Sequence, residues 1–361
     1  MNDEHYMKFA LQLARKGRGY VNPNPMVGAV IVKNGLIIGK GYHRRFGGNH
    51  AEIKAIKSAG SKVKGSTLYV TLEPCCHKGK TPPCVNAITE SKIARVVIGT
   101  IDSNPLVSGK GINFLQKGGI KVHTGVLEKE CRELNEIFFH YMETGLPFVT
   151  LKYAQTLDGR IATVTGISQW ISSPASRKFA HRLRVEHDAI LVGRGTVERD
   201  NPELTVRLVR GRNPLRVIVD SRLSVSEKAK IFQNTSLTPT LIATVKTDLD
   251  PKFKKLAARG AEISTVKADE NGKVSLKSLF KILALRKISS VLIEGGAQII
   301  TSVLKHDLAD RLVVVISPRI IGKGIEAVGD LHIKNLQSAK KISVRRIFRS
   351  GDDIVLDGRL I

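Results

Sequence analysis

Hydrophobic positions along the chain recur at two spacings, and their order predicts a fold. In the first part, helical spacing occurs at residues 3–17, 50–59, 82–91, 110–117 and 128–141. Strand-like apolar runs occur at residues 26–33, 36–42, 67–72, 95–101 and 120–124, the first two joined by an Asn-Gly pair typical of a hairpin. Strands that alternate with helices favour an α/β layer sandwich with parallel strands.

A domain boundary is predicted near residue 145, where a helix ends and the strand-like run 148–154 begins. A chain of 361 residues is too long for one ordinary core, so we expect two domains, 1–145 and 146–361. The second domain has its own α/β pattern and is not a copy of the first. Its expected helices are 175–184, 251–259, 276–285 and 297–304, and its expected strands are 189–192, 216–219, 240–244, 290–293, 311–317, 343–349 and 353–358.

Three residues near the middle of the first domain have the chemistry of a zinc site. His50, Cys75 and Cys84 offer one imidazole and two thiols, which leaves a fourth tetrahedral position for water. Glu52 follows the histidine by two residues and, by helical geometry, should point away from it, yet could still reach a water on the metal. A histidine, a nearby glutamate and a Pro-Cys pair are the constellation of zinc deaminases, in which the glutamate moves protons.

One alternative is a closed structural zinc site of three cysteines and one histidine, in which Cys76 or His77 would be the fourth ligand. The carboxylate of Glu52 beside the zinc histidine argues against that alternative and favours a catalytic site. Polar residues in loops near strand ends could surround the metal, although for any one alone surface solvation or turn formation is the simpler reading. These are Asn24, His43, Lys80, Thr81 and Asn104, of which Lys80 and Thr81 are the best candidates to hold a substrate phosphate.

Four stretches of the second domain place glycines or small polar residues where a cofactor could approach the backbone. Glu294-Gly295-Gly296-Ala297-Gln298 is a strand-to-helix turn able to offer N–H groups to a phosphate, although half of such turns serve only packing. Residues 219–222 end a strand with a hydroxyl and a guanidinium that could bind a ribose 2′-phosphate. The other stretches are 153–159 and 194–197. Trp170, the only tryptophan, is either a core residue or a cofactor contact.

With these stretches assembled, the chain resembles the bifunctional riboflavin-biosynthesis deaminase–reductase family over nearly its whole length. The motifs that carry the resemblance are Asn22–Gly28, Gly41–His43, His50–Glu52, Thr71–Cys75, Thr81–Cys84, Leu157–Arg160, Ser168–Ile171, Gly193–Val197, Asp200–Pro202 and Glu294–Gln298. The zinc motif alone is shared with other deaminases, whereas its combination with the second half is specific. The sequence departs from the family at Asn49, Cys76 and Ser103, where proline, serine and proline are usual.

The resemblance implies a cytidine-deaminase-like α/β/α domain followed by a dihydrofolate-reductase-like α/β domain. It implies zinc-dependent deamination of 2,5-diamino-6-ribosylamino-4(3H)-pyrimidinone 5′-phosphate with Glu52 as proton shuttle, then NADPH-dependent reduction of the ribosyl group to ribityl. Positions that match NADP contacts are Ala154, Trp170, Thr196, Asp200, Ser221, Gly296, Ala297, Gln298, Ile299, Ile300, Thr301 and Ser302. Positions that match substrate contacts are Lys152, Ser168, Arg184, Leu204, Arg207 and Glu294.

Charge and composition bear on the partners. The net charge of +26 is spread as +10 over residues 1–145 and +16 over the rest, without the clustered patch of a nucleic-acid-binding protein. Aromatic residues are only 5%, which disfavours an RNA-binding base deaminase that would stack bases. We expect a small phosphorylated pyrimidine as substrate, no nucleic acid or membrane partner, and a homo-oligomer formed through the reductase domain. Three cysteines within ten positions and a start without a signal-like segment favour the cytoplasm.

Overall fold

The computed structural model describes residues 2–361 and confirms the predicted α/β class. The chain divides into two compact units, the first ending at Gly145 and the second spanning Leu146–Ile361. Within the described residues, every helix is too short or too polar to cross a membrane.

The first unit contains a five-stranded sheet in the order β2-β1-β3-β4-β5. Its strands are β1 (Gly28–Lys33), β2 (Leu36–Tyr42), β3 (Thr67–Leu72), β4 (Arg95–Thr100) and β5 (Lys121–Thr124). The predicted hairpin is present, because β1 pairs antiparallel with β2. The strands β3, β4 and β5 are parallel to one another, so their carboxyl ends lie at one edge of the sheet.

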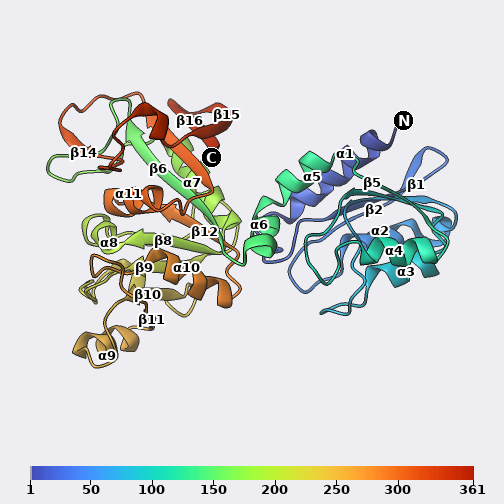
Figure 1. The fold of residues 1–361 in the computed structure, drawn as a ribbon, viewed down its shortest axis with the longest axis horizontal. Helices are drawn as coiled ribbons and strands as arrows, with labels where there is room; N and C mark the ends of the chain where they lie inside the picture. Colours follow the sequence, from blue (N-terminus) through green and yellow to red (C-terminus); the bar gives the residue numbers. More distant parts are fainter. Residues whose placement is uncertain (1) are drawn as a thin grey trace. The chain divides into compact units, whose positions relative to one another are not determined.

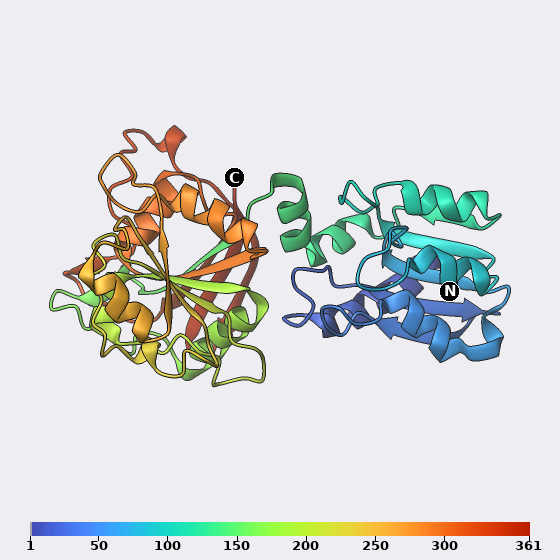
Figure 2. The ribbon, with the colours of Figure 1, turned by 90° about the horizontal axis from the view of Figure 1, so that it is seen from below.

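Helices cover both faces of this sheet, as expected when side chains alternate along a strand. On β1, Ala29 and Ile31 pack toward α2 (Ala51–Ala59), α3 (Cys84–Glu90) and α4 (Lys110–Lys117). Val30 and Val32 pack toward the opposite face, with α1 (Asp3–Ala14) and α5 (Glu128–Leu134). Figure 1 shows the two groups of helices on the two faces, and Figure 2 shows α2, α3 and α4 side by side.

Helix α2, which carries the motif glutamate, lies in unusually close contact with strand β2. A Cβ atom on Gly39 would lie 2.4 Å from the carbonyl oxygen of Ala55, and one on Gly41 would lie 2.3 Å from that of Ala51. Neither distance is possible for a real side chain, so glycine at both positions lets the helix backbone approach the strand. This close packing sets the distance between the start of α2 and the sheet.

The single helix predicted at residues 128–141 is wrong, because the structure divides it into α5 and α6 (Glu136–Thr144) at Asn135. The Asn135 side chain accepts a hydrogen bond from Met26 N (2.7 Å) and donates one to Met26 O (2.9 Å). Asn135 is buried and leaves the helical conformation at φ −111° and ψ 26°. The helix is therefore interrupted where a side chain fixes the loop that precedes β1.

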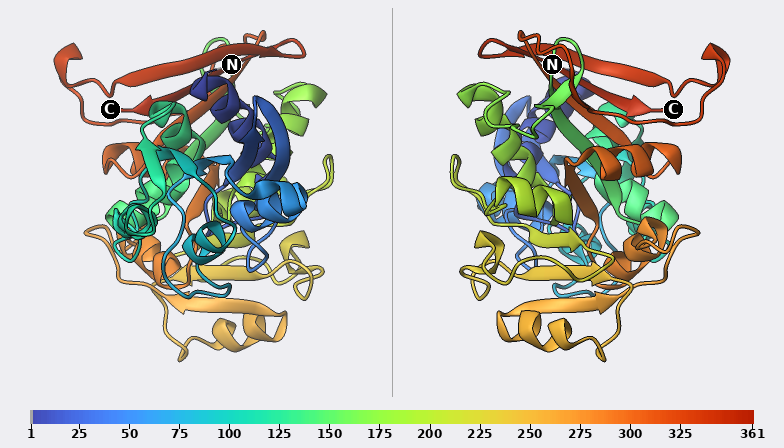
Figure 3. Two further views of the ribbon diagram at one scale, coloured as in Figure 1. Left: turned by 90° about the vertical axis from the view of Figure 1, so that its right-hand side faces the viewer. Right: turned by 90° about the vertical axis from the view of Figure 1, so that its left-hand side faces the viewer.

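The second unit contains a nine-stranded sheet in the order β11-β10-β9-β8-β12-β6-β13-β16-β15. Its strands are β6 (Phe148–Thr156), β8 (Ala189–Gly193), β9 (Leu215–Val219), β10 (Thr240–Thr244), β11 (Ala261–Thr265), β12 (Ser290–Glu294), β13 (Arg311–Ser317), β15 (Ile342–Ser350) and β16 (Asp353–Leu360). The strands from β11 to β13 are parallel, and β16 and β15 add an antiparallel hairpin at one edge. Figure 3 shows this succession, from the red hairpin to the gold β11.

Helices α10 (Leu276–Leu285) and α11 (Ala297–Lys305) cover one face of this sheet, and α8 (Arg194–Asp200) and α9 (Pro251–Ala258) cover the other. Helix α7 (Pro174–Glu186) packs near the antiparallel end, where Leu183 contacts residues of β12, β13 and β16. Four elements of this unit were not expected from the sequence: α8, β11, β7 (Arg160–Thr163) and β14 (Gly324–Glu326). Each is short and buries few apolar side chains, one in α8 and one in β11, so no clear periodicity marks it.

Candidate functional site

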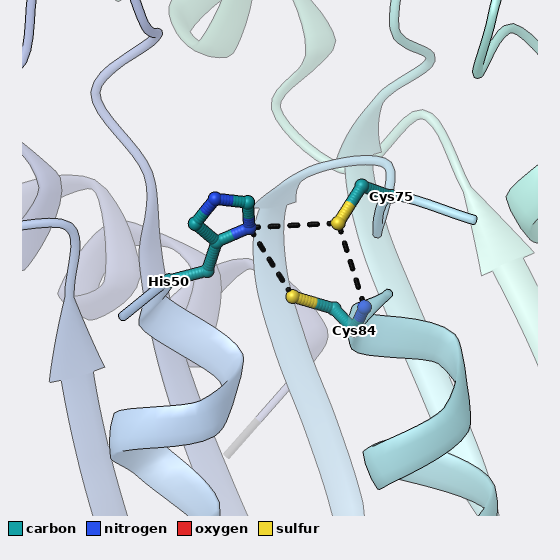
Figure 4. Close-up of side chains that lie close together, drawn as sticks. All are labelled: His50, Cys75 and Cys84. Carbon is teal, nitrogen blue, oxygen red and sulfur yellow. Dashed lines mark hydrogen bonds between the residues drawn. The ribbon is translucent and has the colours of Figure 1, made fainter. Parts of the chain in front are cut away.

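Three side chains from different elements of the first unit meet at the carboxyl edge of its parallel strands. His50 is the residue before α2, Cys84 is the first residue of α3, and Cys75 follows β3 in a loop. The Nδ1 atom of His50 lies 3.5 Å from Cys75 Sγ and 3.3 Å from Cys84 Sγ (Figure 4). The backbone N–H of Cys84 also donates to Cys75 Sγ at 3.4 Å.

These separations fit a tetrahedral zinc ion. For a Zn–N bond of about 2.0 Å and a Zn–S bond of about 2.3 Å, tetrahedral ligand atoms lie about 3.5 Å apart. Among the described residues, His50, Cys75 and Cys84 form the one group of His, Cys, Asp or Glu side chains close enough to share a metal. Cys76 is not in this group, since its Sγ faces Leu106 O at 3.7 Å, so the arrangement is not the closed three-cysteine site.

Glu52 lies in this site, and one oxygen of its carboxylate accepts no hydrogen bond. Its side chain is buried, and its Oε2 atom has no hydrogen-bond partner. Burial raises the pKa of the Glu52 carboxyl to about 7, against the opposing effect of His50. His50 precedes the helix with extended backbone (φ −68°, ψ 166°), so the helical angle between His50 and Glu52 does not apply. Glu52 is not among the side chains close enough to share the metal.

A second glutamate, Glu73, organises the loops around the candidate metal ligands, a role that was not expected from the sequence. Its carboxylate accepts hydrogen bonds from four backbone N–H groups, those of Asp102, Gly109, Gly111 and Ile112, at 3.0–3.2 Å. The charge thus lies at the amino end of α4, where a carboxylate is stabilised. Glu73 joins the strand end before Cys75 to the loop after β4. The one feature of the sequence that could have indicated this role is that Glu73 directly precedes the Pro-Cys pair.

Of the five polar candidates of the first unit, the structure brings His43 and Thr81 into contact with His50, and Asn24 into contact with His43. His43 is buried, receives a hydrogen bond from Asn24 (3.3 Å), and stacks edge-on against His50 at 5.3 Å between ring centroids. Burial, reinforced by His50, lowers the pKa of His43 to about 4. Thr81 Oγ1 lies 3.4 Å from Nε2 of His50, where it can orient the ring.

The other two candidates have local roles in the structure. The Lys80 ammonium lies 4.0 Å from the centre of the Phe46 ring, a cation–π contact. The Asn104 side chain accepts a hydrogen bond from Leu106 N (3.0 Å) within the loop that Glu73 holds. No hydrogen bond between described residues links either side chain to the three zinc ligands.

In the second unit, one cavity of about 1690 Å³ receives the ends of β6, β8, β9 and β12. Ligands of parallel α/β sheets bind at these carboxyl ends. The cavity is lined by every residue that the family resemblance implied for this domain. These are Lys152, Ala154, Ser168, Trp170, Arg184, Thr196, Asp200, Leu204, Arg207, Ser221, Glu294 and Gly296–Ser302.

An ion pair lies deep in this cavity. Arg184 on α7 donates through Nε and Nη2 to the two carboxylate oxygens of Glu294, each at 2.8 Å. Burial alone would raise the pKa of Glu294, but Arg184 and then Lys152 outweigh it and lower that pKa to about 2. Lys152 is the register partner of Glu294 on the neighbouring strand. Burial lowers the pKa of the Lys152 ammonium, and Glu294 opposes this shift.

The turn before α11 has the geometry of a phosphate cradle. Gly295 and Gly296 have φ of 89° and 83°, which side chains rarely adopt, and the N-terminus of the nine-residue helix α11 follows directly. A Cβ on Gly296 would lie 3.1 Å from Thr196 Oγ1, and one on Gly193 would lie 3.0 Å from Ile299. Close approach of backbone and a helix N-terminus fit a dinucleotide such as NADPH.

Contacts of four other residues that line the cavity bear on their expected roles. The Ser168 hydroxyl donates to Asp200 at 2.8 Å, and Ser221 Oγ accepts from Val274 N at 2.9 Å. Trp170 is 56% exposed with Arg177 over its ring at 4.5 Å, so it is not a core residue. Asp220, which could be mistaken for a ribose-binding acid, instead accepts backbone N–H groups of its own turn.

Comparisons with known proteins agree with this division into two sites. A family model described as "RibD C-terminal domain" matches residues 147–356. Another, described as "Cytidine and deoxycytidylate deaminase zinc-binding region", matches residues 1–100. The chain is 48% identical to the riboflavin biosynthesis protein RibD of Aquifex aeolicus, with 98% of this chain and 97% of that protein covered. It is 38% identical to RibD of Escherichia coli, with 99% of each covered.

Solved structures match over the full length. The diaminohydroxyphosphoribosylaminopyrimidine deaminase/5-amino-6-(5-phosphoribosylamino)uracil reductase from Thermotoga maritima has a TM-score of 0.88 and 41% identity, with 99% of both chains covered. RibD from Acinetobacter baumannii (form 1) has a TM-score of 0.90 and 33% identity, again with 99% of both chains covered. A zinc-binding deaminase domain, an NADPH-dependent reductase domain and relatives that match both together place this chain in the RibD family of riboflavin biosynthesis proteins.

Proposed function

We propose that residues 1–145 deaminate 2,5-diamino-6-ribosylamino-4(3H)-pyrimidinone 5′-phosphate and that residues 146–361 then reduce the ribosyl group. The product would be 5-amino-6-(5-phosphoribitylamino)uracil. Support comes from the two sites, which offer different chemistry in separate units of one chain. The observation that carries the proposal is the buried, unpartnered Oε2 of Glu52 beside the zinc ligands.

In the deaminase unit, zinc held by His50, Cys75 and Cys84 would lower the pKa of a bound water to near neutrality. Glu52 would accept the proton of that water and deliver it to the departing amine, as a general base and then a general acid. Asn24, His43, Lys80, Thr81 and Asn104 are our candidates for holding or orienting the substrate around this centre.

In the reductase unit, NADPH would supply the hydride. The N-terminus of α11, Ala297–Ser302, would hold its phosphates, and Ala154, Trp170, Thr196, Asp200, Ser221 and Gly296 would form the rest of its site. Lys152, Ser168, Arg184, Leu204, Arg207 and Glu294 would hold the phosphorylated substrate. Lysine and arginine outnumber acidic side chains around the cavity, which favours two anionic ligands.

The test is to supply the purified chain with the diamino substrate, zinc and NADPH and to follow ammonia and NADPH separately. We expect ammonia release without NADPH, and NADPH oxidation only after deamination or with pre-deaminated substrate. RNA offered in place of the pyrimidine should release no ammonia. Release of ammonia from RNA, or NADPH oxidation by the unreacted diamino compound, would contradict the proposed order of reactions.

We further propose a homo-oligomer formed through the second unit. Strand β15 is the edge strand of its sheet and exposes Val344 and Ile347, at 50% and 66%. An exposed apolar edge is a pairing surface for a second chain. Light scattering on the intact chain would measure the assembly, and Ile347→Lys should reduce it.

We also propose a cytoplasmic location, because all four cysteines are free, as in a reducing compartment.

A further inference from the structure

The loop at residues 203–208, between α8 and β9, has no regular structure, yet side chains from outside it hold its backbone. Arg216 donates to Glu203 O (3.3 Å) and Arg184 donates to Thr205 O (2.8 Å). Asn213 Oδ1 accepts from Val206 N at 2.7 Å. A loop fixed in this way is preorganised, which is how binding sites reduce the entropy cost of ordering on ligand binding.

His181 on α7 supplies the remaining support for this loop. Its Nδ1 atom accepts hydrogen bonds from the backbone N–H groups of Arg207 (3.0 Å) and Leu208 (3.5 Å). His181 and Arg184 are three residues apart, so they lie on the same face of the helix. One turn of α7 therefore holds the loop through both a donor and an acceptor.

The hydrogen bonds determine the tautomer of His181. Because Nδ1 accepts two N–H groups, the ring proton must be on Nε2. Burial, then the positive charges of Arg184 and Arg207, lower the pKa of His181 to about 4, so the ring is neutral near pH 7. Nε2 is then a hydrogen-bond donor.

This donor has no partner within the described chain, although the residue His181 is only 3% exposed. Nε2 is not among the fully enclosed, unpaired polar atoms, and the residue lines the cavity of the reductase unit. The Nε2–H group is thus directed at the cavity. Its neighbour Arg207 also lines the cavity, and no hydrogen bond or ion pair between described residues engages the Arg207 guanidinium. Arg184, in contrast, is neutralised by Glu294.

We propose that His181 is a substrate-binding and positioning residue of the reductase site, which takes a phosphate monoester. Nε2–H donates to a phosphate oxygen next to the Arg207 guanidinium, while Nδ1 holds the backbone that presents Arg207. A neutral donor beside an uncompensated cation suits a dianionic phosphate, because both of its partners remain available across the neutral pH range. This inference rests on the proposed reductase function and adds a residue to its substrate site.

The test uses His181→Asn, whose amide oxygen can replace Nδ1 as acceptor but which lacks the Nε2 donor. The matched control is His187→Asn, at the residue that follows α7. His187 is buried, both of its ring nitrogens are paired inside the protein, with Leu183 O (2.7 Å) and Thr150 Oγ1 (2.8 Å), and it does not line the cavity. Steady-state reduction is measured with pre-deaminated substrate and with the same compound lacking its 5′-phosphate.

We expect His181→Asn to raise KM for the phosphorylated substrate about tenfold or more, the loss of one hydrogen bond to a charged group. KM for NADPH and the poor reaction of the dephosphorylated compound should not change. His187→Asn should leave all three values unchanged and lower only the unfolding temperature. An unchanged KM in His181→Asn, or equal losses with both compounds, would overturn the proposal.

A second measurement needs neither turnover nor a stable variant. In wild-type protein labelled with ¹⁵N-histidine, ribose 5-phosphate should shift the signal of one neutral Nε2–H imidazole, whereas ribose should not. Absence of such a shift at saturating ribose 5-phosphate would also overturn the assignment. If the wild-type chain fails to reduce the pyrimidine, the proposed function fails, and this titration still decides the role of His181.

Discussion

Arg184 and Glu294 form a bidentate ion pair at the base of the reductase cavity, and each side chain is only 11% exposed. The pKa of Glu294 is depressed to about 2, below the ordinary carboxyl value of 4.5. The stabilisation from this pair is therefore complete above the ordinary value and is lost as the pH falls toward about 2. Between about pH 5 and pH 8 we expect it to be constant.

Glu294→Gln should destabilise the second unit strongly, because Arg184 then remains buried without a counter-charge. Removing one partner of a buried pair costs about 3–5 kcal/mol. Denaturant unfolding at neutral pH measures this cost. The control is Glu262→Gln, which removes an exposed pair with Arg286 and should cost at most about 1 kcal/mol. Equal losses of unfolding free energy in the two variants would show that the buried Arg184 pair stabilises the unit no more than an exposed pair does.

Removal of zinc should separate the two activities. The three candidate zinc ligands belong to the first unit, whereas the cavity is lined only by residues of the second. A chelator should therefore abolish ammonia release and leave reduction of pre-deaminated substrate nearly intact. Parallel assays before and after dialysis measure both rates. Equal loss of both activities in a folded protein would refute the two-site assignment.

Glu52→Gln should retain about one zinc per chain, because the zinc ligands are untouched. Deamination should fall by about 10²–10⁴-fold, the usual contribution of general acid–base catalysis. Metal analysis and ammonia release on the same sample give both values. Cys75→Ser is the comparison, since it should lose metal as well as activity. Loss of zinc from Glu52→Gln would instead make Glu52 a metal ligand.

Coenzyme choice should depend on the turn after β9. Ser221 and the exposed Arg222 line the cavity, whereas the Asp220 carboxylate is occupied by its own turn. We expect the wild type to prefer NADPH over NADH. Ser221→Ala with Arg222→Ala should weaken NADPH by about one to two powers of ten and leave NADH nearly unchanged. Arg222→Lys keeps the cation and should lose less. An equal loss of affinity for NADPH and NADH would show that other residues contact the 2′-phosphate.

Much of the fold was predictable because its strands bury continuous apolar runs. Strand β10 and helix α10 begin and end where their periodicity predicts. The break between α5 and α6 was not predictable, since it depends on the contact of Asn135 with Met26, 109 residues earlier. Elements with one buried apolar residue, such as α8, left no pattern to recognise.

In the candidate sites too, features that depend on the three-dimensional contacts could not be predicted from the sequence. Ligand chemistry predicted His50, Cys75 and Cys84 as one group, and the structure brings these three side chains close enough to share a metal. The backbone at His50 is extended, so helical periodicity could not predict how Glu52 lies relative to His50. His181 gave no signal at all, since its position depends on hydrogen bonds to a loop more than twenty residues away along the chain.

The contacts of Glu73 and of the glycines on β2 bear on how metal loading relates to folding. Glu73 anchors the strand end before Cys75 through four backbone N–H groups, and Gly41 seats the start of α2 after His50. None of these contacts involves the ligand atoms, so the first unit has its own means of holding the ligand-bearing segments in place. Unlike a zinc finger, whose folding free energy is its metal-binding free energy, this unit should persist as a folded apoprotein and regain activity when zinc returns.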